Sequence, residues 1–236
     1  MKKSNYYLLT FLSMMLFLPM LLLACSDDED RFNDTNVYLS CPNDKHPHMI
    51  DLGLPSGTKW ACCNVGSKKP DSFGYYIQWG ETYGYSGSSV CDWSTYDHFI
   101  GGPYMVEDIG SNISGTEYDV AHVSWGKLWR MPTVNEAQEL VDNCSHEWTT
   151  LGNVSGLKLS GKNGGSIFLP AAGIRQETLF FNDGVVGYYW TSEPGGASRE
   201  SSRILCFTSN YIGPVGDFHN SANRCYGLSV RPVAAN

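Results

Sequence analysis

Apolar positions near the middle of the chain recur at helical spacing behind a strong start signal. Pro132 interrupts the preceding backbone, Thr133 is a good N-cap, and Glu136 three positions later completes a capping box. The apolar residues that follow fall on one helix face: Ala137, Leu140, Val141 and Cys144. The pattern predicts a helix that starts after Thr133 and points Cys144 into the core at its end.

Short runs of alternating or continuous apolar residues predict strands on both sides of this helix. A strand pair is expected within residues 49–61, around a turn at Pro55, Ser56 and Gly57, and residues 75–80 form another short strand. Later strands are expected at 156–159, 166–170, 188–190, 204–207 and 228–231. Residues 81–118 are irregular. One clear helix among many strands predicts an α+β fold.

Within 204–207, alternation places Ile204 and Cys206 on one face of the strand. Leu205 and Phe207 then lie on the other face. The expected strand is therefore apolar on both sides.

The N-terminus has the three parts of a secretory signal: Lys2 and Lys3, an apolar run over residues 6–23, and Ala24 directly before Cys25. This ending resembles a lipobox, in which the cysteine is diacylated and becomes the new N-terminus. An apolar run of about 18 residues could also just span a bilayer as a helix. Pro19 and the acidic residues that follow favour the lipoprotein interpretation. We expect a signal peptide over residues 1–24 and a membrane partner reached through lipid on Cys25.

Four acidic residues, at positions 27–30, follow the lipid site. They resemble the surface-export signal of Bacteroidetes lipoproteins, and such a run is a solvated tether in either case. We therefore expect a flexible tether over residues 25–48. The expected location is the outer membrane, lipid-anchored and facing the cell exterior.

Composition narrows the classes of protein that remain. The 236 residues carry a formal net charge of −8, so nothing neutralises phosphates and a nucleic-acid partner is excluded. Aromatic residues make up 13% and charged residues 17%, and there are 25 glycines, which indicates many turns and short strands with large aromatic fillers. Residues 49–236 fit one domain with a proper core.

Seven cysteines remain after Cys25, so at least one must stay unpaired if the exported protein forms disulfides. No pair has the C-x-x-C spacing of a zinc site, and Cys62 and Cys63 point in opposite directions in an extended chain. His46 and His48 are better explained as part of a loop. We expect no metal and no cofactor.

Six motifs occur in order along the chain and agree with one known family. They are residues 51–60, 80–82, 125–133, 167–173, 187–192 and 227–233. Together they resemble the Fibrobacter succinogenes major paralogous domain, which is abundant in lipoproteins of gut Bacteroidetes. The helix entry at 130–136 and the closing 227–231 are also similar to the formylglycine-generating-enzyme type of C-type-lectin-like fold. The resemblance implies a compact twisted antiparallel sheet, one or two helices and long irregular loops that present a surface.

The resemblance also implies roles for individual residues. The family pattern implies a disulfide between Cys63 and Cys144. Cys206 and Cys225 could form a second bridge if residues 204–207 and 226–231 are neighbours, or both could remain thiols. Arg231, next to Pro232 on the last strand, is expected to form a structural ion pair rather than to contact a ligand.

Enzymatic chemistry is not expected. A formylglycine-generating enzyme needs a close reactive cysteine pair, whereas Cys206 and Cys225 are 19 positions apart, and no Gly-x-Ser-x-Gly elbow is present. Glu193, Pro194 and Gly195 resemble the Glu-Pro-Asn of calcium-dependent lectins. Gly195 replaces the amide, however, and a Pro-Gly turn is the better explanation.

Residues between Trp190 and Gly227 are rich in the side chains of adaptable recognition surfaces. Similar C-terminal segments occur in target proteins of diversity-generating retroelements, where they bind varied ligands. The residues expected to bind ligand are Arg199, Arg203, Asn210, Tyr211, Phe218, His219, Asn220, Asn223, Arg224 and Tyr226. The leading hypothesis is a surface lipoprotein that binds an external glycan or protein. The alternatives are a structural or tip subunit of a surface or pilus assembly, an unrecognised enzyme, and a merely polar loop.

Overall fold

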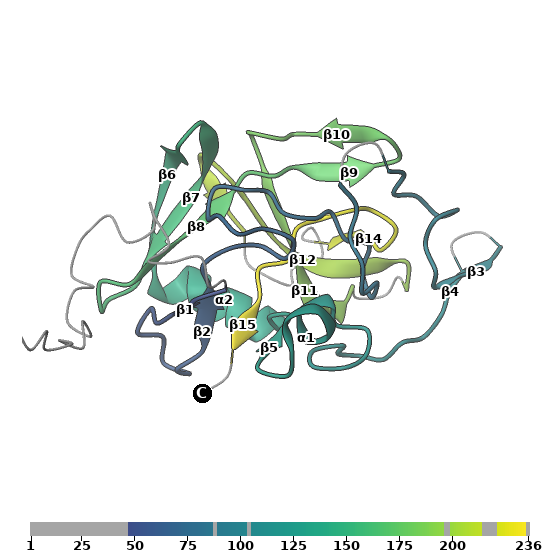
Figure 1. The fold of residues 1–236 in the computed structure, drawn as a ribbon, viewed down its shortest axis with the longest axis horizontal. Coiled ribbons are helices and arrows are strands. Elements are labelled where there is room, and N and C mark those ends of the chain that lie inside the picture. The colour runs from purple at the N-terminus through teal and green to yellow at the C-terminus, as the bar shows by residue number, and fades with distance from the viewer. Residues whose placement is uncertain (1–46, 87–88, 103–104, 196–198, 214–220, 235–236) are drawn as a thin grey trace, which may run out of the picture. The chain divides into compact units, whose positions relative to one another are not determined.

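The computed structural model describes residues 47–86, 89–102, 105–195, 199–213 and 221–234. Over these ranges the chain forms mostly antiparallel sheets with two short helices, so the predicted α+β class is confirmed (Figure 1). The elements in chain order are β1 Met49–Ile50, β2 Lys59–Ala61, β3 Phe99–Gly101, β4 Met105–Val106, α1 Val120–Trp125, β5 Trp129–Arg130, α2 Val134–Asn143, β6 Ser145–Leu151, β7 Val154–Ser160, β8 Ser166–Pro170, β9 Ile174–Gln176, β10 Leu179–Phe181, β11 Gly187–Pro194, β12 Ser201–Thr208, β13 Tyr211–Ile212, β14 Ser221–Asn223 and β15 Val233–Ala234.

The first sheet joins the two ends of the described domain in the order β1-β2-β15-β5. Val233 of β15 pairs with Trp60 on one side and with Arg130 on the other. The strand expected at 228–231 is only partly present, because Leu228 and Ser229 form isolated bridges and the regular strand starts after Pro232. Proline lacks the N–H that a continuous ladder requires.

Helix α2 confirms the helix predicted after Thr133. The Thr133 hydroxyl accepts a hydrogen bond from the Glu136 N–H, and the Glu136 carboxylate accepts one from the Thr133 N–H, which completes the capping box. Ala137 and Leu140 are buried against strands of two sheets, and Cys144 ends the helix in the same core cluster. Local sequence signals therefore define this element at both ends.

The sheet β6-β7-β8 lies next to α2 in the sequence and keeps a regular antiparallel register from Ser145↔Ser160 to Ser160↔Ser166. Strand β8 has the predicted bounds and is buried throughout. Gly156 allows close approach of the strands, since a Cβ there would lie 2.4 Å from the Leu169 carbonyl oxygen.

Strands β11 and β12 separate two hydrophobic clusters. Leu205 and Phe207 of β12 pack with α2 in the first cluster, whereas Ile204 and Cys206 belong to the second, as the predicted alternation requires. The framework of the domain is thus built around one strand pair that is apolar on both faces.

Arg231 is buried, and the groups that it contacts differ from the predicted ion pair. Its guanidinium donates to Asn64 Oδ1 at 2.8 Å and to the carbonyl oxygens of Ala61 and Phe168 at 2.9 Å each. All three acceptors are neutral, so the residue is structural but forms no ion pair with them. Hydrogen bonds from a buried charge to neutral acceptors are nevertheless among the stronger ones in proteins.

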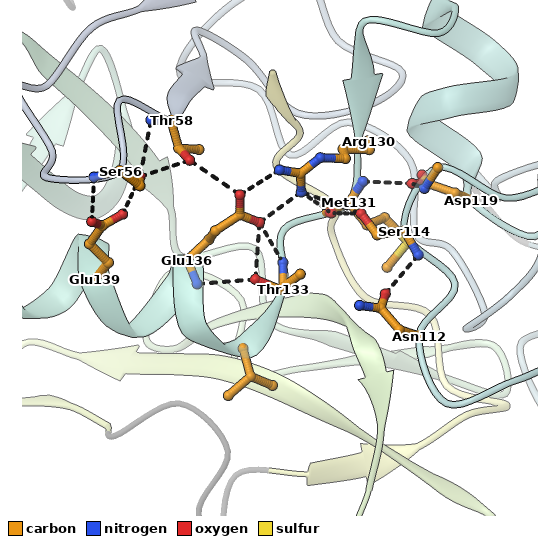
Figure 2. Close-up of polar contacts among 12 residues, drawn as sticks. Ser56, Thr58, Asn112, Ser114, Asp119, Arg130, Met131, Thr133, Glu136 and Glu139 are labelled. Atoms are coloured by element: carbon orange, nitrogen blue, oxygen red, sulfur yellow. Dashed lines mark hydrogen bonds and ion pairs between the residues drawn. The ribbon is translucent and has the colours of Figure 1, made fainter. Parts of the chain in front are cut away.

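A polar network at the start of α2 ties four segments together (Figure 2). The Glu136 carboxylate accepts hydrogen bonds from both terminal nitrogens of Arg130, at 2.5 and 2.7 Å. It also accepts one from the Thr58 hydroxyl at 3.2 Å. Arg130 reaches on to Ser114, and the Met131 N–H donates to Asp119. The turn at 54–58, the loop at 112–119, β5 and α2 are held in one arrangement by these bonds.

Candidate ligand-binding surface

Strand β12 is the centre of the sheet that carries the predicted binding residues. It pairs with β11 along one edge, and with β13 and β14 along the other. The register Ser201↔Asn223 and Arg203↔Ser221 places the predicted C-terminal segment directly beside this strand. Figure 1 shows β14 next to β12.

An open hollow of about 590 Å³ lies on the Cys206 face of this sheet. We call it the tyrosine hollow because three tyrosines line it. Its lining residues are Ile174, Tyr188, Ile204, Cys206, Tyr211, Ser221, Ala222, Asn223 and Tyr226. The volume is within the range of about 300–1,000 Å³ typical of small-ligand sites.

Among the described residues, no acidic or basic side chain lines the tyrosine hollow. Burial raises the pKa of Tyr188, and it raises the pKa of the Cys206 thiol to about 11. Aromatic rings with hydroxyl groups at their edges, next to an Asn223 amide, combine apolar area with hydrogen-bonding groups. The hollow can therefore stack on an apolar ligand face and bond to hydroxyl or amide groups.

A second hollow of about 460 Å³ lies on the other side of the 223–224 backbone. We call it the arginine hollow. Its lining residues are Glu107, Asp108, Gly110, Ser111, Pro194, Gly195, Arg199 and Arg224. Neighbouring residues Asn223 and Arg224 thus contribute to different hollows.

The structure places some of the predicted binding residues in the two hollows and others outside both. Tyr211, Asn223 and Tyr226 line the tyrosine hollow, and Arg199 and Arg224 line the arginine hollow. Asn210 is exposed in the turn between β12 and β13 and lines neither hollow. Arg203 alternates with Ile204 and so faces the opposite side of β12. Phe218, His219 and Asn220 lie outside the described residues, as do the signal peptide, Cys25 and residues 25–46 of the tether.

Several lining residues were not predicted. Tyr188 was assigned to the framework motif 187–192, although alternation of adjacent Tyr188 and Tyr189 would have placed one of them on the outer face. Glu107 and Asp108 come from a loop more than 100 positions before Arg224, and no pattern in the sequence connects them.

The hairpin β9–β10 next to the tyrosine hollow exposes several apolar side chains. Leu179, Phe180, Phe181 and Val185 are each more than 40% exposed, and Phe181 pairs with Ile174 of the hollow. The turn is strained, because Glu177 has φ +52°, and it is held by two backbone hydrogen bonds between Glu177 and Cys91. An exposed apolar edge strand is a typical protein-docking feature.

Neither predicted disulfide is present, and no disulfide joins the six described cysteines. Cys206 and Cys225 lie beyond opposite ends of the β12–β14 pairing. If that register is continued, Cys225 falls beside position 199, which is seven residues from Cys206 along the strand. This is on the order of 20 Å, whereas bridged Cα atoms lie within about 7 Å. The prediction was wrong because β12 pairs with residues 221–223 rather than 226–231.

For the other predicted bridge, the Cys63 thiol donates to the Ser67 carbonyl oxygen at 3.3 Å. Cys144 is buried at the end of α2, where burial raises the pKa of its thiol to about 11.

Glu193 has a structural position. Its Oε1 accepts a hydrogen bond from the Val134 N–H at 3.2 Å, at the positive end of the α2 dipole.

Among the described residues, no group of three or more His, Cys, Asp or Glu side chains could hold a metal ion. In the same part of the chain, no helix is both long and apolar enough to cross a membrane.

No family model, curated protein or solved structure matches this chain. The observed class is an α+β domain with two neighbouring surface hollows.

Proposed function

We propose that this chain is a lipid-anchored surface protein of the outer membrane whose domain binds an external glycan in the tyrosine hollow. One observation carries the proposal: Tyr188, Tyr211, Asn223 and Tyr226 line a single open hollow of about 590 Å³. Stacking rings with adjacent hydroxyl and amide groups suit the alternating apolar faces and hydroxyl edges of sugars. A concave site of this size favours a glycan over a flat protein surface.

The domain is, in this proposal, of the C-type-lectin-like kind. Support comes from the framework positions that several family-like motifs occupy. Trp60, Trp190 and Arg231 are buried, β8 is buried throughout, and the Thr133–Glu136 capping box starts α2. The lipobox-like residues before Cys25 support the anchor.

A glycan array probed with the full chain, purified in detergent, tests the proposal. Tyr211→Ala removes a half-exposed ring from the hollow and is expected to weaken binding about tenfold, which corresponds to about 1.4 kcal/mol. Tyr75→Ala is the matched control, because Tyr75 is similarly exposed but does not line the hollow. Equal binding by the Tyr211→Ala variant and the wild-type chain would refute the site.

The β9–β10 hairpin favours a second candidate function, a subunit of a surface assembly. In that role, the exposed edge of β10 would pair with a strand of a neighbouring subunit. Leu179→Lys would then abolish assembly, whereas Leu128→Lys, at another exposed leucine, would not. Analytical ultracentrifugation tests this candidate function. If the wild-type chain and the Leu179→Lys variant are both monomeric at all concentrations, self-assembly through this edge is refuted.

A further inference from the structure

The arginine hollow brings together two arginines that form no ion pair with a carboxylate in the described part of the chain. Arg224 is only 3% exposed, and its guanidinium lies 4.3 Å from the ring centroid of Trp79. Its Nε donates to the Ser201 carbonyl oxygen at 3.3 Å. The ring and this bond orient the guanidinium plane in the wall of the hollow.

Arg199 is exposed at the rim, and its side chain has no hydrogen bond or ion pair within the described part of the chain. The positive charge of Arg199 adds to burial in lowering the pKa of Arg224, while the Tyr96 hydroxyl and Asp108 oppose this shift. Both arginines line the same hollow, which brings two like charges to one site. An anion bound between them would relieve their repulsion and receive charge-assisted hydrogen bonds.

The opposite wall offers acceptors. Asp108 Oδ1 accepts the Gly110 N–H at 3.1 Å, and Glu107 Oε2 lies 3.2 Å from His98 Nδ1. Within the described residues, one oxygen of each carboxylate has a protein partner, and the other oxygen can accept a ligand hydroxyl. The two carboxylates balance the two arginines in formal charge, so an anionic group is favoured only where it contacts the guanidinium groups directly, with hydroxyl groups toward the acids.

We infer that the arginine hollow binds a carboxylate-bearing sugar, with its carboxylate between Arg199 and Arg224 and its hydroxyls on Glu107 and Asp108. A volume of about 460 Å³ accommodates one or two sugar rings. A zwitterionic peptide has a related charge pattern. Its ammonium group, however, would meet two exposed carboxylates, and an exposed ion pair contributes little affinity.

The test is isothermal titration of the full chain with glucuronate, its neutral methyl ester, N-acetylneuraminate and glycylglycine. The two acidic sugars are expected to bind in the millimolar range, and the ester at least tenfold more weakly. Arg199→Ala should reduce affinity for glucuronate at least tenfold, since a charge-assisted hydrogen bond is lost. Arg203→Ala is the matched control, because that arginine does not line the hollow.

Arg199 is exposed, so its replacement should leave the thermal midpoint unchanged and the binding result interpretable. Tyr211→Ala should leave glucuronate binding intact, which separates this inference from the proposal for the tyrosine hollow. Equal affinity for glucuronate and its ester, or no effect of Arg199→Ala, would overturn the inference. Stronger binding of glycylglycine than of either sugar would assign the hollow to peptides instead.

Discussion

Replacing Glu136 by alanine tests the polar network at the start of α2 most severely. The substitution removes the bidentate ion pair with Arg130, the capping-box bond from the Thr133 N–H and the bond from the Thr58 hydroxyl (Figure 2). Arg130 would keep its weaker contacts with Ser114 and the Met131 carbonyl oxygen. The turn at 54–58 and β5 would each lose their side-chain bond to the start of α2.

The magnitude follows from burial. The Arg130 and Glu136 side chains are 25% and 14% exposed, so the pair is intermediate between a surface and a buried salt bridge. A surface salt bridge contributes up to about 1 kcal/mol, whereas disruption of a buried one costs about 3–5 kcal/mol. We take about 2 kcal/mol for the pair and about 1 kcal/mol for the capping bond. Glu136→Ala should therefore lower the free energy of unfolding by about 3 kcal/mol. For a domain of this size, the thermal midpoint should fall by about 6–12 °C.

Urea unfolding followed by tryptophan fluorescence measures this change, since the chain has seven tryptophans. Asn135→Ala, at an exposed position on the same helix, should change stability by less than about 0.5 kcal/mol. A loss below about 1 kcal/mol for Glu136→Ala would refute the assignment of Glu136 as the centre of the network.

The pH dependence gives an independent check on Glu136. Burial acts to raise its pKa, but the hydrogen bonds from Arg130 and Thr133 outweigh burial and hold the pKa below its ordinary value. A carboxyl with a depressed folded-state pKa stabilises the fold above its unfolded pKa of about 4.3, and this contribution is lost as pH falls. The stability difference between wild type and Glu136→Gln should therefore vanish on acidification.

Three further predictions concern the core and the thiols. Arg231→Met should destabilise the fold by more than about 3 kcal/mol in urea unfolding, because the acceptors on Asn64, Ala61 and Phe168 would be left buried without a donor; a loss under 1 kcal/mol would contradict this. Gly187→Ala should cost at least about 2 kcal/mol, since its Cβ would lie 2.0 Å from the Phe207 ring, and an unchanged thermal midpoint would show that the ring moves freely. Burial raises the pKa values of Cys144, Cys206 and Cys225 to about 11, 11 and 12. The contribution of these thiols to stability should therefore be full below the unfolded pKa of about 8.5 and fall as pH rises toward 11–12. Rapid alkylation of the native protein at about pH 8, detected by mass spectrometry, would contradict the raised pKa values.

Elements with strong local signals were predictable from the sequence. Helix α2 has a capping box and a continuous apolar face, and β8 is an uninterrupted apolar run. Helix α1 has only six residues, too few for an apolar period to be recognised. The β9–β10 turn was missed because Glu177 takes a positive φ that turns usually assign to glycine or asparagine.

The binding surface was predictable only in part, because it combines local and long-range relationships. Tyr211, Asn223 and Tyr226 could be grouped since they lie within one C-terminal segment. Strand register decided another case, since pairing of β12 with residues 221–223 separated Cys206 from Cys225. Arg203 lines neither hollow, although it lies on the same strand. Glu107 and Asp108, the carboxylates that line the arginine hollow together with Arg224, come from a distant loop, which no local pattern identifies.

The dissociation constant of the full chain for the best glycan found on an array tests the central claim most directly. Titration of the wild-type, Tyr211→Ala and Tyr75→Ala proteins gives the comparison at one salt concentration. The account predicts about tenfold weaker binding for Tyr211→Ala and an unchanged constant for Tyr75→Ala. Identical constants for all three proteins would contradict ligand binding in the tyrosine hollow.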